Sequence, residues 1–135
     1  MPPRTILIAD PEPQVRSFVK TALRSEEYRV FEARGGLEAL CVCACHPVDL
    51  LLIATDLAGI DSVRLAEKLS HPFPTMRVLY LAAATEAGSA DDFLAKPLCA
   101  EVLRDRIRQT FELATVRKRP ATEPTGGEAA RQRRA

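Results

Sequence analysis

Five short runs with the composition of β-strands, separated by segments with helical spacing, constrain the fold of this chain more than any other feature. The runs are TILIA (5–9), YRVFEA (28–33), DLLLIA (49–54), RVLYLAA (77–83) and DFLA (92–95). Strands that alternate with helices at this spacing form βαβ units, which build a parallel sheet with right-handed crossovers. No internal repeat and no second set of elements is present, so the pattern predicts one α/β domain.

Helices are predicted between these runs from apolar periodicity and from Pro and Gly residues that mark helix ends. The first opens at Glu12-Pro13, because Pro is tolerated in a first helical turn, and its apolar face is Val15, Phe18, Val19, Ala22 and Leu23. The others are predicted from about Leu37 to Cys45, from Val63 to Leu69 and from Glu101 to about Ala114.

Length and composition favour a small globular protein. A chain of 135 residues suits one core, and its longest apolar stretch, Leu50 to Ala54, is far too short to cross a bilayer. The first residues, MPPRTILIAD, lack the apolar region and cleavage site of a signal peptide. We therefore expect a cytoplasmic protein without membrane contact.

The last residues differ from the rest in composition. Residues 117–135 carry six basic and two acidic side chains, a charge of +4, whereas the whole chain carries +1. The segment is rich in Pro, Gly and Ala without apolar periodicity, so we predict a domain over residues 1–116 and a disordered basic tail over 117–135. No aromatic residues interleave its charges, so we do not expect it to contact nucleic acid.

Together the motifs resemble the receiver domain of two-component response regulators, over about residues 4–115. ILIADPEP resembles the family's first strand with its acidic pair, VDLLLIATDLAGID its third strand and loop, and DDFLAKPL its fifth strand with Lys-Pro. EARGGLEAL and RVLYLAAA match the intervening pieces in the same order. The resemblance implies a flavodoxin-like fold with strand order 2-1-3-4-5 and a site between strands 1 and 3.

The family's phosphorylation site is only partly kept at the matching positions. Asp10 of the acidic pair, Lys96 and Pro97 are present, and Phe93 stands at the aromatic switch position. The remaining functional positions have changed: the second acidic position is Pro11, the acceptor position is Ala54 and the hydroxyl position is Ala82. The resemblance thus predicts a degenerate pocket without a catalytic residue.

Asp56 is the alternative acceptor. Asp49 lies five residues before Ala54, as the family's strand-start Asp lies before its acceptor, and Leu57 to Asp61 match the loop that follows. A shift of two residues would destroy both matches. Asp56 then occupies the position at which the family supplies a backbone carbonyl to the metal.

No resident cofactor is expected. Mg²⁺ requires several oxygen ligands in octahedral geometry, and Asp10 alone is a weak candidate. We expect weak Mg²⁺ binding at most, with Lys96 paired to Asp10.

The stretch between Ala82 and Lys96 is short for a receiver and has no helical apolar pattern in ATEAGSA. We predict a fourth helix that is shortened or absent. The usual dimer face would then be remodelled, and any homodimer would use a non-standard face.

Three thiols and an imidazole fall within CVCACH (41–46), which raises a rival function. On a helix Cys41 and Cys45 share one face, and a redox or metal sensor could be built on them. The simpler interpretation is that the cysteines serve as small apolar side chains, with Cys43 in the core beside Leu40.

These observations predict an atypical receiver that acts through protein–protein contact without phosphorylation, and not an enzyme. Its expected partner is a histidine kinase or another regulator. A working phosphoacceptor that uses Asp56 with Mg²⁺ remains the alternative.

Overall fold

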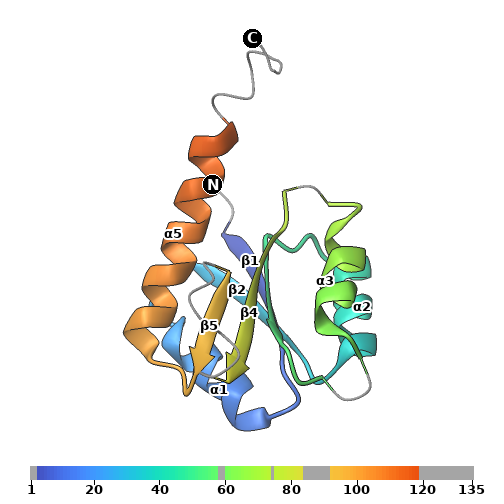
Figure 1. The fold of residues 1–135 in the computed structure, drawn as a ribbon. Helices are drawn as coiled ribbons and strands as arrows, with labels where there is room; N and C mark the ends of the chain where they lie inside the picture. Colours follow the sequence, from blue (N-terminus) through green and yellow to red (C-terminus); the bar gives the residue numbers. More distant parts are fainter. Residues whose placement is uncertain (1–2, 58–59, 74, 84–91, 119–135) are drawn as a thin grey trace. The chain divides into compact units, whose positions relative to one another are not determined.

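A computed structural model describes residues 3–57, 60–73, 75–83 and 92–118. Its sheet contains β1 (Arg4–Ala9), β2 (Tyr28–Ala33), β3 (Leu50–Ala54), β4 (Arg77–Ala83) and β5 (Phe93–Lys96). All described pairings are parallel, in the order β2-β1-β3-β4-β5 (Figure 1). The predicted flavodoxin-like fold class and strand order are confirmed.

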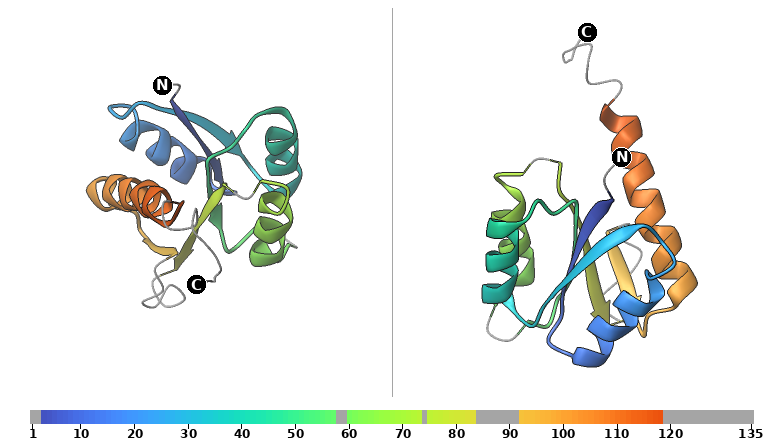
Figure 2. Two further views of the ribbon diagram at one scale, coloured as in Figure 1. Left: turned by 90° about the horizontal axis from the view of Figure 1, so that it is seen from above. Right: turned by 180° about the vertical axis from the view of Figure 1, so that it is seen from behind.

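Helices cover both faces of this sheet. The described helices are α1 (Pro13–Ala22), α2 (Gly36–Cys45), α3 (Ser62–Ser70) and α5 (Ala100–Lys118). Helices α2 and α3 lie side by side on one face of the sheet, and α1 lies on the other (Figure 2). The chain divides into two compact units between residues 103 and 104. No helix in the described ranges is both long enough and apolar enough to span a membrane.

The helix ends follow local chemistry. Pro13 stands in the first turn of α1, where its missing N–H costs no hydrogen bond. Asp61 caps α3, because its side chain accepts hydrogen bonds from Val63 N and Arg64 N at 3.1 and 3.2 Å. The predicted bounds of α1, α2 and α3 agree with these ends within about two residues, the usual uncertainty of helix boundaries.

The core is centred on the strands. The central strands β1 and β3 contain near-continuous apolar runs because both of their faces are covered. Side chains that are wholly buried there include Ile6, Leu7, Ile8, Leu50, Leu51, Leu52 and Ile53. The rigid sheet therefore holds the carboxyl ends of its strands in fixed positions.

Two side-chain predictions were wrong. Phe18, assigned to the buried face of α1, is 37% exposed, and Leu40, assigned to the core beside Cys43, is 52% exposed. Cys43 itself is buried, as predicted. Apolar periodicity identifies a helix face, but it does not reveal whether a neighbouring element covers the whole of it.

Some predictions fall on other parts of the chain. The loss or shortening of a fourth helix concerns residues 84–91, which lie outside the described residues. Helix α5 continues to Lys118, four residues beyond its predicted end. The remainder of the predicted tail, residues 119–135, also lies outside the described residues.

Candidate functional site

The predicted site residues lie at the ends of different strands, and these ends meet at one edge of the sheet. Asp10 directly follows β1, Ala54 ends β3, and Lys96 ends β5. Ala82 lies near the end of β4, which is paired in register with β3 and β5. Because parallel strands bring their carboxyl ends to the same edge, the site lies where the strand order reverses, between β1 and β3.

Asp10 is the most constrained of these residues. Its side chain is fully buried, and its Oδ2 accepts a hydrogen bond from Lys96 Nζ at 2.8 Å. Its Oδ1 accepts a hydrogen bond from Glu12 N at 2.9 Å. Its backbone is held as well, because Asp10 N donates to Ala33 O at 3.1 Å. Both carboxylate oxygens are therefore engaged, and the expected pairing with Lys96 is present.

Lys96 lies between two carboxylates. Asp56 Oδ1 is 3.9 Å from Lys96 Nζ, beyond the short contact that Lys96 makes with Asp10. The Asp56 side chain is 65% exposed and that of Lys96 is 20% exposed. The buried Asp10 thus has the dominant interaction with this lysine, and Asp56 remains largely in solvent.

Ala54 and Ala82 leave the floor of the site without reactive groups. Both residues are buried, and each contributes only a methyl group. The main chain of Ala54 is also occupied, because its carbonyl accepts a hydrogen bond from Ser62 Oγ at 2.6 Å. Neither position can supply a nucleophile or a hydroxyl donor.

The oxygen donors at this edge do not fit a strong Mg²⁺ site. Both oxygens of Asp10 are already bonded, and Pro11 brings no side-chain oxygen. Across the part of the chain that the structure describes, no cluster of three His, Cys, Asp or Glu side chains could hold a metal ion. Mg²⁺ prefers several carboxylate, carbonyl and water oxygens. Here Asp10 is already engaged and Asp56 is 65% exposed beside Lys96, so the two carboxylates form a poor donor set.

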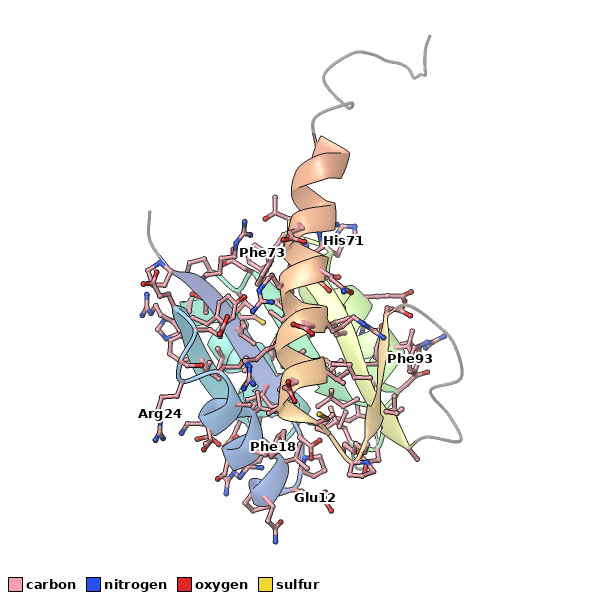
Figure 3. All side chains as sticks on the ribbon, turned by 90° about the vertical axis from the view of Figure 1, so that its left-hand side faces the viewer. Glu12, Phe18, Arg24, His71, Phe73 and Phe93 are labelled. Carbon is pink, nitrogen blue, oxygen red and sulfur yellow. The ribbon has the colours of Figure 1, made fainter. Side chains whose placement is uncertain are left out.

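A cleft opens beside these residues. Its volume is about 640 Å³, and it lies beside the first turns of α1, the loop after β3 and the ends of β4 and β5. Figure 3 shows two of its lining residues, Glu12 directly before α1 and Phe18 on α1. The lining residues are Glu12, Gln14, Val15, Phe18, Thr55, Asp56, Leu81, Ala82, Ala83, Lys96, Pro97 and Leu98. The exposure of Phe18 therefore contributes an aromatic wall to the cleft.

Phe93, at the predicted switch position, packs beside Tyr80. Their ring centroids are 5.0 Å apart, and the two residues are register partners on β5 and β4. Burial raises the pKa of Tyr80, with a smaller contribution from nearby acidic residues such as Asp92. Phe93 lies away from Glu12 and Phe18 (Figure 3), so its ring packs outside the cleft.

Sequence reasoning missed the role of Arg16. Its side chain is only 10% exposed, its Nη1 donates to Asp10 O at 2.7 Å, and its Nε donates to Glu32 Oε1 at 3.0 Å. Lys20 Nζ contacts the other oxygen of Glu32 at 2.7 Å. The hydrogen bond from Lys20 lowers the pKa of Glu32, and Arg16 lowers it further. Arg16 shares a helical stripe with Val19, three residues later, and this spacing could have indicated its burial.

The cysteines do not form one cluster. Cys41, Cys45 and Cys99 are exposed, whereas Cys43 is buried. Burial raises the pKa of the Cys43 thiol, which keeps it protonated and unreactive. A sensor built on Cys41 and Cys45 stays a prediction.

Comparison with known proteins defines the family. Residues 6–108 match the response regulator receiver domain family. The chain therefore belongs to this family of signalling domains, which function in two-component systems and interact with histidine kinases and other regulators. Receiver domains are signalling domains and not enzymes, although some relatives carry the name phosphotransferase.

Individual relatives differ in length. The response regulator GtcR of Aneurinibacillus migulanus is 30% identical over 81% of this chain, which spans only 50% of GtcR. Sporulation initiation phosphotransferase F of Bacillus subtilis is 26% identical over 80% of this chain and 94% of its own length. The chain spans 10% of the sensor protein EvgS of Escherichia coli, at 28% identity over 83% of this chain.

Solved structures show the same fold. A CheY-like receiver domain from Methanospirillum hungatei superposes with a TM-score of 0.75 at 23% identity, over 85% of this chain and 98% of that one. The receiver domain of the hybrid histidine kinase CckA gives a TM-score of 0.67 at 32% identity, over 78% and 97% respectively.

Proposed function

We propose that this chain is a pseudo-receiver: a receiver domain that accepts no phosphoryl group on aspartate and signals through protein–protein contact. One observation carries the proposal. A buried methyl group, that of Ala54, stands where the family resemblance places the nucleophile, and the neighbouring Lys96 is paired with the buried Asp10. A carboxylate oxygen is needed for attack on phosphorus, and the methyl group has none.

The changes at the site support one another. Pro11 removes a metal ligand, Ala54 removes the nucleophile, and Ala82 removes the hydroxyl that would bond to a phosphoryl oxygen. Losing one of these groups could be offset by a neighbour, but losing all three leaves no nucleophile, too few metal ligands and no hydroxyl to bond a phosphoryl oxygen. What remains is the Asp10–Lys96 pair, which we interpret as a structural remnant that stabilises the site.

Incubation with acetyl phosphate and Mg²⁺, followed by intact-mass measurement, tests this proposal. We expect no base-labile mass increase of one phosphoryl group. A related receiver that has aspartate at the acceptor position serves as the positive control under the same conditions. A stoichiometric adduct on this chain would contradict the proposal.

A second candidate is a working receiver that uses Asp56, and one observation favours it. Asp56 is exposed, lines the cleft and lies 3.9 Å from Lys96, so its carboxylate is accessible to a small phosphoryl donor. An adduct that disappears in Asp56→Ala but persists in Glu12→Gln, another residue of the cleft lining, would establish this candidate. Our proposal predicts no adduct in any of the three proteins.

We further propose that the partner is a histidine kinase or another regulator in the cytoplasm. Relatives such as EvgS and CckA bear the names of sensor and histidine kinase proteins, so domains of this family occur within partners of that kind. Affinity capture from the native cell, followed by mass spectrometry, should recover such a protein. Recovery should be unchanged in Asp56→Ala, because binding does not require phosphorylation.

A further inference from the structure

Helix α2 presents an apolar stripe on its exposed side. Leu37 is 75% exposed and Leu40 is 52% exposed, and Cys41, Ala44 and Cys45 are also exposed. These five residues, here called the outer stripe, are spaced i, i+3, i+4, i+7 and i+8, which places them on one face of a helix. The outer stripe contains no charged residue.

The opposite face of α2 already covers the core. Gly36, Ala39 and Cys43 are buried there, so the helix is apolar on two opposite faces. The only charged residue of α2 is Glu38, which pairs with Arg34 at 2.9 Å. A helix that is apolar all round is normally covered on both sides, so the outer stripe is a candidate contact surface.

Apolar side chains of the neighbouring segment extend this surface. Ile60 is 40% exposed and Val63 is 44% exposed. Ile60 reaches the start of α2, because a methyl group placed on Gly36 would lie 2.6 Å from Ile60 Cδ1. Helices α2 and α3 lie side by side (Figure 2), so the outer stripe and these two residues lie on the same side of the sheet.

We propose that the outer stripe binds the outer stripe of a second copy of this chain, with the two α2 helices antiparallel and the two-fold axis near Cys41. The size of the side chains supports this partner. The large residues Leu37 and Leu40 lie in the first half of the stripe, and the small Ala44 and Cys45 lie in the second half. Antiparallel pairing about Cys41 places Leu37 of one copy opposite Cys45 of the other and Leu40 beside the other copy's Cys41, so large side chains meet small ones and the surface is self-complementary.

Charge is consistent with this arrangement. In an antiparallel pair, the positive end of each helix dipole lies beside the negative end of the other. The last turn of α2 has no basic residue to offset its dipole. Arg34, whose side chain is 76% exposed, precedes the first turn and would approach the last turn of α2 in the second copy. Because Arg34 already pairs with Glu38 at 2.9 Å, the electrostatic gain of the antiparallel pair comes mainly from the opposed helix dipoles.

The area of the surface limits the affinity. A stable interface buries about 800 Å² per partner, and one helix stripe with two flanking side chains offers less. We therefore expect a weak, concentration-dependent dimer with a Kd of roughly 10–100 μM. This inference goes beyond the proposed function, since it does not depend on whether the domain is phosphorylated.

Sedimentation of the full chain over a range of concentrations tests the proposal. The apparent mass should rise towards that of a dimer, and Leu40→Glu should weaken association at least about tenfold. Val102→Glu is the matched control, because Val102 is also 52% exposed but is not on α2. Leu37→Glu provides a second variant if Leu40→Glu fails to fold. A monomer at all concentrations, or equal loss in Val102→Glu, would overturn the proposal.

Crosslinking tests the register. Diamide takes two electrons and two protons from a pair of thiols, so it joins copies whose cysteines lie opposite each other. In Cys45→Ser/Cys99→Ser, the remaining exposed thiol is Cys41, and we expect rapid formation of a covalent dimer. In Cys41→Ser/Cys99→Ser, Cys45 would face Leu37 of the second copy, so crosslinking should be much slower. Equal rates, or a fast rate that survives Leu40→Glu, would contradict the antiparallel arrangement.

Discussion

Replacing Lys96 with Met should destabilise the protein far more than replacing Lys20 with Met. Both lysines form ion pairs of similar length: Lys96 Nζ is 2.8 Å from Asp10, and Lys20 Nζ is 2.7 Å from Glu32. The two pairs differ in exposure. Asp10 is 0% exposed, whereas the side chains of Lys20 and Glu32 are 47% and 38% exposed.

The magnitudes follow from this difference. Removing one partner of a buried pair leaves an uncompensated charge, which typically costs about 3–5 kcal/mol. Lys96 is 20% exposed, so water can partly replace it, and Asp10 keeps the hydrogen bond from Glu12 N. We therefore expect Lys96→Met to cost roughly 2–3 kcal/mol. Lys20→Met should cost about 0.5 kcal/mol, the value of an exposed pair, because Glu32 retains Arg16.

Urea denaturation at neutral pH, followed by circular dichroism, measures these free energies of unfolding. In Asp10→Asn/Lys96→Met the buried charge is absent, so the double variant should recover part of the stability that Lys96→Met loses. Equal effects of Lys96→Met and Lys20→Met would show that burial does not determine the strength of these pairs, and the reasoning would fail.

Three further predictions concern the site and its surroundings. Ala54→Asp should destabilise the protein by about 1 kcal/mol, because it places a second carboxylate beside Asp10. This variant should also remain unphosphorylated by acetyl phosphate. Stoichiometric phosphorylation with unchanged stability would contradict both expectations. Mg²⁺ titration should give a Kd of about millimolar or weaker, and micromolar affinity would show that another oxygen ligand, such as Asp56, takes part. Lys20 lowers the pKa of folded Glu32, so this pair stabilises the protein above the unfolded pKa and its contribution is lost as pH falls through the folded pKa. When the pH is lowered, the free energy of unfolding of Lys20→Met should therefore fall by a few tenths of a kcal/mol less than that of the unchanged protein. Identical pH curves for the two proteins would contradict this prediction.

The sequence by itself determined the elements and their order. The strand Tyr28–Ala33 was predicted to the residue, and Arg77–Ala83 was as well, because short runs rich in β-branched, aromatic and other apolar residues are local signals. The helix starts at Pro13 and near Gly36 were predicted from Pro and Gly, because the fixed φ of Pro and the conformational freedom of Gly are also local properties. Resemblance to the receiver family then supplied the strand order and the edge of the sheet at which the site lies.

The tertiary structure decided which polar groups are buried and which apolar groups remain in solvent. Arg16 can be buried because two acceptors on neighbouring segments, Asp10 O and Glu32 Oε1, accept the hydrogen bonds that its guanidinium donates. Both faces of α2 are apolar, and only the position of the sheet leaves Leu40 exposed. Asp10 and Lys96 are 86 residues apart in the chain, and their pair forms because two parallel strands end at the same edge. Periodicity and capping are local properties of the sequence, whereas burial and ion pairing depend on contacts between distant segments that exist only in the folded chain.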